Sequence, residues 1–144
     1  MIDASDEPVP LTMPLEILGF IIAKAREYDA EVAPVNEDSG SNPTDDEARD
    51  ILEATRNNPT RQELKAAVNS LNDDQRIELL ALTWLGRGDY LPGDWSEALE
   101  EAGRRHDRRE AEYLAATPLL ADYLEEALDL LGYSMEDLEE AETP

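Results

Sequence analysis

The stretch that decides the fold is NDDQRIELLALTWLGRGDY, residues 72–90. Apolar side chains recur at positions 77, 80, 81 and 84, which share one helical face, and leucines at 79, 82 and 85 fill much of the remaining circumference. A helix that is apolar on nearly all sides needs neighbours on several sides. The pattern therefore predicts a central buried helix over residues 72–86.

Both ends of this helix carry capping signals. Asn72 followed three residues later by Gln75 is typical of a capping box, in which each side chain bonds the other residue's backbone. Gly86 enters the left-handed conformation at low cost, so we expect the helix to end there.

Length and composition bound the remaining possibilities. The chain has 144 residues and no cysteine, which excludes disulfides, thiolate nucleophiles and thiolate metal sites. We expect a flexible arm at 1–11, a single helical domain at 12–132, and an acidic tail at 133–144 that is frayed or disordered. Neither a signal peptide nor an apolar run of membrane-spanning length is present in the sequence, so we expect a cytoplasmic protein.

The charge balance is strongly acidic. There are 12 Lys and Arg against 35 Asp and Glu, giving a net charge of −23. Such a field repels nucleic acid and lipid surfaces, so we expect no direct nucleic-acid binding and no membrane partner. It suits a solubilising surface in a salt-rich host, a surface that mimics nucleic acid, or attraction to a basic partner.

Further amphipathic segments surround the central helix. Their expected starts, marked by capping residues or proline, are near Thr12, Thr44, Thr60, Asp94 and Pro118. A long acidic loop should cover residues 29–43, Gly132 should end the last helix, and the first helix should pack on the central one. The prediction is an all-α bundle of about six short helices around the central helix, packed orthogonally rather than as long up-and-down helices.

The clearest basic feature follows the fifth predicted helix. Arg104, Arg105, Arg108 and Arg109 account for four of the 12 cations, with His106, the sole histidine, among them. The arginines suit a phosphate or an acidic partner, or they lie against the acidic C-terminal third of the chain. A single histidine excludes a multi-histidine metal site within one chain.

Three aromatic residues lie close together in the sequence near the end of the central helix. Trp84, Tyr90 and Trp95 should close one end of the core, and a ligand-stacking role is the alternative.

Three stretches carry a family resemblance. They are KARE at 24–27 with the loop that ends in GSNP at 40–43, LTWLGRGD at 82–89, and PLLADYLEE at 118–126. The chain resembles an uncharacterised bacterial family of small, acidic, all-helical proteins catalogued as domain of unknown function 3775, over roughly residues 13–132. The resemblance implies an intracellular bacterial protein and brings no activity, cofactor or catalytic residue.

The leading hypothesis is a non-catalytic protein that binds another protein or itself, since no nucleophile with its base can be assembled. No cofactor is expected. The candidate interaction residues are Arg87, Asp89, Tyr90, Arg104, Arg105, Arg108, Arg109, Asp122, Tyr123 and Glu125.

Two other functions remain open. Carboxylates at helical spacing suit a Mg²⁺-dependent hydrolase of nucleotides or phosphate esters, with Glu97, Glu101, Glu126 and Asp129 as metal ligands. Such pairs also arise by chance in so acidic a chain. The third hypothesis, the nucleic-acid mimic, needs rows of acids on a folded surface.

Overall fold

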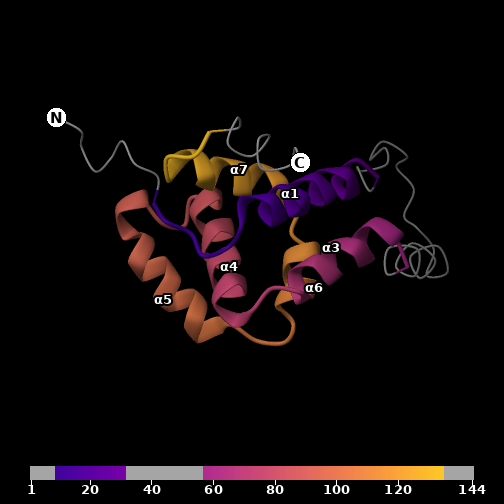
Figure 1. Cartoon of the computed structure of the whole chain (residues 1–144), viewed down its shortest axis with the longest axis horizontal. Helices are drawn as coiled ribbons and strands as arrows, with labels where there is room; N and C mark the ends of the chain where they lie inside the picture. The colour runs from indigo at the N-terminus through magenta and orange to yellow at the C-terminus, as the bar shows by residue number, and fades with distance from the viewer. Residues whose placement is uncertain (1–8, 32–56, 135–144) are drawn as a thin grey trace, which may run out of the picture.

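The computed structural model describes residues 9–31 and 57–134, and within them it is helical and contains no strand (Figure 1). The helices are α1 (Leu15–Glu31), α3 (Pro59–Asn69), α4 (Asp73–Arg87), the 3-10 turn η3 (Pro92–Asp94), α5 (Trp95–Arg105), α6 (Glu110–Ala115) and α7 (Leu120–Leu130). The predicted all-α fold is confirmed. The helix predicted from Thr44 and most of the predicted acidic loop lie outside the described residues.

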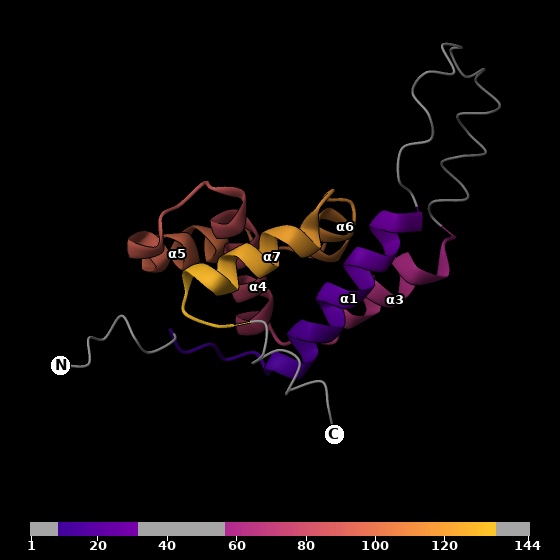
Figure 2. The same ribbon diagram turned by 90° about the horizontal axis from the view of Figure 1, so that it is seen from above.

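Helix α4 is the centre of the fold, as predicted. Every residue from Leu79 to Leu85 is buried, and α4 packs against α5, α6 and α7. The hydroxyl of Thr83 is satisfied by donating to the backbone carbonyl of Leu79 at 3.0 Å. Figures 1 and 2 both show α4 crossing the direction of α7, so the packing is not that of long parallel helices.

The capping box at the start of α4 is confirmed, whereas its predicted end is wrong. Asn72 and Gln75 exchange side-chain to backbone hydrogen bonds of 2.8 and 3.1 Å. The helix continues through Gly86 to Arg87, and Gly88, with φ of 97°, is the left-handed cap. Gly86 is needed for packing, because a Cβ there would overlap the backbone carbonyl oxygen of Tyr123 in α7.

Helix α1 packs mainly against α3 and α7, not on α4 as the sequence predicted (Figure 2). It also begins at Leu15, later than Thr12. The preceding residues are held by Glu78 of α4, a buried carboxylate that accepts the Thr12 and Met13 backbone N–H groups at 2.8 and 2.9 Å. α4 therefore holds the chain that precedes α1, whereas α1 itself packs mainly on α3 and α7.

The other helices begin close to the predicted positions, but the predicted capping residues do not all form the cap. Asn58 caps α3 by accepting the N–H of Arg61 at 2.9 Å, whereas the predicted cap, Thr60, donates its hydroxyl to Glu31 of α1 at 2.7 Å. Asp94 precedes α5 without a side-chain cap bond. Helix α7 begins at Leu120, two residues after the predicted Pro118. Gly132 ends it with φ of 100°, as predicted.

Candidate functional site

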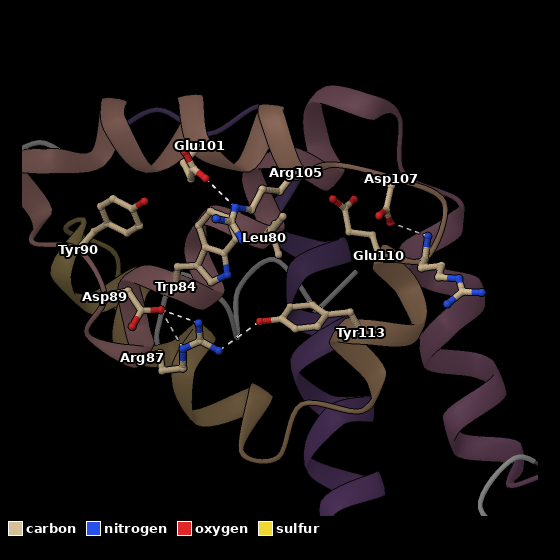
Figure 3. A pocket seen from close by; sticks show the side chains of 11 residues that line it. Leu80, Trp84, Arg87, Asp89, Tyr90, Glu101, Arg105, Asp107, Glu110 and Tyr113 are labelled. Carbon is tan, nitrogen blue, oxygen red and sulfur yellow. Dashed lines mark hydrogen bonds and ion pairs between the residues drawn. The ribbon is translucent and has the colours of Figure 1, made fainter.

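A pocket of about 520 Å³ opens between α4, α5 and α6 (Figure 3). Leu80, Trp84 and Arg87 come from one face of α4, because they are spaced by four and three residues. Glu101 and Arg105 come from α5, one helical turn apart. The remaining lining residues, from the two connectors and α6, are Asp89, Tyr90, Asp107, Arg109, Glu110 and Tyr113.

Arg87 joins two sides of this pocket. Its Nε and Nη2 donate to Asp89 Oδ2 at 2.9 and 2.6 Å, and its Nη1 donates to the hydroxyl oxygen of Tyr113 at 3.2 Å. Asp89, and to a lesser degree Tyr113, raise the pKa of Arg87. The Arg87-Gly88-Asp89 tripeptide is thus a turn closed by its own ion pair.

The aromatic group is divided between core and pocket. Trp84 and Tyr90 stack with ring centroids 6.1 Å apart and planes 26° apart, and both line the pocket. Trp95 is buried in the core. The predicted closure of the core by these aromatics holds for both tryptophans, while the exposed side of the Trp84 and Tyr90 pair faces the pocket.

The arginines at the end of α5 share a single carboxylate. Glu101 Oε1 accepts from Arg104 Nη2 and Glu101 Oε2 accepts from Arg105 Nε, both at 2.6 Å. These two cations lower the pKa of Glu101, Arg105 first. In the part of the chain that the structure describes, the guanidinium groups of Arg108 and Arg109 form no ion pair or hydrogen bond.

Arg104 and Arg105 pair with a carboxylate one turn back on α5, and residues 135–144 of the acidic C-terminal third, on which this cluster was expected to pack, lie outside the described residues. A long side chain reaches a carboxylate three or four positions away without any tertiary contact.

His106 links the pocket wall to the start of α4. Its Nδ1 lies 2.8 Å from Glu110 Oε1, and its Nε2 lies 3.3 Å from Asp73 Oδ1. Burial raises the pKa of Glu110, although His106 acts in the opposite direction. Arg76, and then His106, lower the pKa of Asp73. Both ring nitrogens of His106 therefore lie within hydrogen-bond distance of a carboxylate.

The other predicted candidates lie on α7, away from this pocket. Asp122 and Glu125 bind the guanidinium of Arg26 on α1, at 3.0 and 2.7 Å. The pKa of Arg26 is raised, mainly by its bond to Glu125. Tyr123 lies against Gly86 through its backbone. These residues join α7 to α1 and α4.

The four predicted metal ligands are not gathered into one place. Glu97 and Glu101 are on α5, Glu126 and Asp129 are on α7, and each of these helices packs against α4. Glu101 is bound by two arginines. Among residues 9–31 and 57–134, no three carboxylate or histidine side chains come close enough to hold a metal ion.

Sequence reasoning missed three residues of structural consequence, Tyr113, Glu110 and Glu78. Tyr113 reaches Arg87 from 26 positions away, and no local pattern carries that contact. Glu78 and Glu110 are buried acids, and the only signal for either is an acid flanked by residues that prove to be core.

Comparison with known proteins adds a family and no activity. The model of the family described as "Protein of unknown function (DUF3775)" matches residues 61–133, which include all the pocket residues. No curated protein and no solved structure matches the chain. In the described part, none of the helices has the length and apolar character required to cross a membrane.

Proposed function

The chain belongs to DUF3775, a family of proteins of unknown function, and for this member we propose a non-catalytic role in binding another protein through the pocket between α4, α5 and α6. The observation that carries the proposal is the lining itself, in which Trp84, Tyr90 and Tyr113 alternate with three arginines. Tryptophan, tyrosine and arginine are the residue types that dominate binding energy at protein interfaces.

The surroundings of the pocket also favour a protein partner. Leu91 is 69% exposed and directly follows Tyr90, and Tyr113 is 43% exposed. Exposed apolar groups beside a pocket extend the contact area beyond a small ligand. The strongly acidic surface supplies long-range attraction to a basic partner, which affects the rate of encounter more than the final affinity.

The lining supports binding over catalysis. Its eleven residues include no serine, threonine, cysteine, lysine or histidine, so the nucleophiles that a hydroxyl, thiol, amine or imidazole would supply are missing from the lining. Asp89 and Glu101 are each held in an ion pair with arginine, which makes them poor candidates for a nucleophile or a base.

Asp122 and Glu125 are left out of the proposed docking site because Arg26 already occupies them. We propose that the protein works in the cytoplasm of a bacterium, as the family resemblance of its sequence implies, and the absence of cysteine is compatible with a reducing compartment. We also propose that residues 12–132 fold as one domain, because α1 packs on α7 from the other end of that range.

The test uses two variants with the same change in charge. Arg105→Gln with Arg109→Gln alters the pocket lining, and Arg104→Gln with Arg108→Gln alters the neighbouring arginines, which do not line it. Each protein is immobilised, incubated with lysate of its host at moderate salt, and the retained proteins are identified by mass spectrometry. A partner held by the wild type and by the second variant, but lost by the first, is the expected result.

A partner lost equally by both variants would indicate general charge attraction and no docking site. If the wild type retains nothing and sediments as a monomer, binding to another protein and self-association both fail. Thermal unfolding of both variants serves as the folding control, because surface Arg to Gln changes should shift stability by less than about 0.5 kcal/mol.

A further inference from the structure

The pocket contains hydrogen-bond donors that the fold itself does not use. Arg105 donates to Glu101 through Nε, and within the described residues its two Nη groups donate to nothing. The indole N–H of Trp84 also has no acceptor in the described chain, and its nitrogen is not sealed in the core. Figure 3 shows the indole nitrogen turned toward the side of the pocket where Arg87 and Tyr113 meet.

The carboxylates of the lining, in contrast, each have at least one hydrogen-bond partner within the protein. Asp89 accepts from Arg87, and Glu101 accepts from both Arg104 and Arg105. Asp107 accepts the backbone N–H of Arg109 at 2.8 Å. Glu110 faces His106. The Nη groups of Arg105 and the indole N–H of Trp84 therefore remain for a ligand that supplies acceptor oxygens.

The lining carries three arginines and four carboxylates, so the choice of ligand depends on which cations keep unused donors rather than on net charge. Glu101 alone balances Arg104 and Arg105, and Arg109 adds a cation with no ion-pair partner among the described residues. A guanidinium with free Nη groups binds carboxylate and phosphate oxygens in particular. Leu80 and the aromatic rings supply an apolar wall beside these donors.

We infer that the pocket binds an acidic group, a carboxylate or a phosphate, carried on an aromatic or aliphatic stem of the partner. The inference rests on the proposed function and specifies the chemistry of the partner segment. The volume of about 520 Å³ is within the range that encloses a ligand of small-molecule size, enough for one or two side chains. The net charge of −23 selects partners that are basic elsewhere and present a single acid at this point.

The experiment measures small probes directly. The probes are 3-phenylpropionate, its uncharged analogue 3-phenylpropionamide, and phenyl phosphate, each titrated into ¹⁵N-labelled full-length protein at roughly 0.15 M ionic strength. The chain has two tryptophans, so its NMR spectrum contains two indole N–H signals, and a Trp95→Phe variant identifies that of Trp84.

We expect 3-phenylpropionate to shift the Trp84 signal saturably and the amide to bind at least about tenfold more weakly, since the amide lacks a charge-assisted hydrogen bond. The double variant at Arg105 and Arg109 should lose about tenfold in affinity for the anion. The double variant at Arg104 and Arg108 should lose less than about twofold. Tighter binding of phenyl phosphate than of 3-phenylpropionate would indicate that the acidic group of the partner is a phosphorylated side chain. Tighter binding of 3-phenylpropionate would indicate an Asp, a Glu or a C-terminal carboxylate.

Equal binding of acid and amide, or no shift of the Trp84 signal with any anion, would overturn the inference. The two proposals fail separately. A lysate partner that depends on Arg105 and Arg109, together with no anion selectivity, leaves the proposed function standing. Selective anion binding, with no partner that depends on these arginines, leaves an anion site and removes the protein-binding role.

Discussion

Two of the places where arginine side chains meet carboxylates have opposite ratios of the two groups. At the contact between α1 and α7, one guanidinium, that of Arg26, binds two carboxylates, Asp122 and Glu125. At the end of α5, two guanidinium groups, those of Arg104 and Arg105, share one carboxylate, Glu101. In the first arrangement the guanidinium donors join two helices. In the second, the Nη donors of Arg105 stay unused beside a pocket.

The difference teaches that a polar residue in a recognisable stretch is informative only once its partner is known. Asp122 and Arg105 were equally plausible candidates in the sequence, yet Asp122 is bound to another helix and Arg105 retains donors that face a pocket. We call the first region the closed contact (Arg26, Asp122, Glu125 and the Gly86–Tyr123 approach) and the second the open contact (Glu101, Arg104, Arg105 and the pocket).

The largest effect is expected for a variant that disrupts the closed contact. Gly86→Ala puts a Cβ into the backbone carbonyl of Tyr123, so α4 and α7 must separate, and we expect a loss of about 3 kcal/mol in the free energy of unfolding by urea titration. Gly93→Ala is the control, because a Cβ there meets nothing within 4 Å, and its loss should be under about 0.5 kcal/mol. Equal losses at the two glycines would mean that α4 and α7 do not approach so closely.

The second prediction concerns Glu78. Like the carboxylates of the closed contact, this buried acid accepts hydrogen bonds from other parts of the fold. Glu78→Ala leaves the backbone N–H groups of Thr12 and Met13 without their acceptor, and we expect a loss of about 2 kcal/mol in the same urea titration. Thr12→Val removes only the hydroxyl bond to Glu78, of 3.2 Å, and should cost under about 1 kcal/mol. A smaller loss for Glu78→Ala than for Thr12→Val would show that the carboxylate is not the anchor.

A third pair of variants compares the closed and open contacts directly. Arg26→Gln should lower the unfolding free energy by about 0.5–1 kcal/mol, a small value because the side chain is 51% exposed and its ion pairs are screened by solvent. It should leave partner capture unchanged. Arg105→Gln should do the reverse, with unchanged stability and weakened capture. If both variants affect stability alone, the distinction between closed and open contacts is lost.

The smallest effect is a dependence on pH at the pocket wall. The pKa of Glu110 is raised above its ordinary value of 4.5 by burial, so its contribution to stability is present below about that pH and is lost as the pH rises through the folded pKa. Wild type should therefore lose stability relative to Glu110→Gln as the pH rises above 4.5, measured as the difference between urea midpoints.

Asp73, the other carboxylate that contacts His106, should show a pH dependence of stability with the opposite sign. Its pKa is lowered from 3.8, so its contribution is present above that value and is lost as the pH falls through the folded pKa. Wild type should gain relative to Asp73→Asn as the pH rises toward 3.8, with a constant difference at higher pH. A difference that changes in the same direction for both variants would contradict the distinct environments of the two acids.

The local features of this protein could be predicted from its sequence. Helical periodicity identified α4 as the buried centre, and the Asn72–Gln75 capping box and the Gly132 stop were read correctly, because each depends on residues within one or two turns. The family and the all-α fold were also within reach of sequence patterns. These features are set by propensity, capping and burial of an apolar face, all of which are local.

Only the tertiary structure decided which residues meet across the chain. It placed Gly86 against Tyr123, gave the cap of α4 to Gly88, brought Tyr113 to Arg87, and separated the bound acids of α7 from the arginines of the pocket. The physical reason is that a side chain with several hydrogen-bonding groups binds whichever partner the packing of helices brings within about 3 Å, and spacing along the chain does not encode that distance.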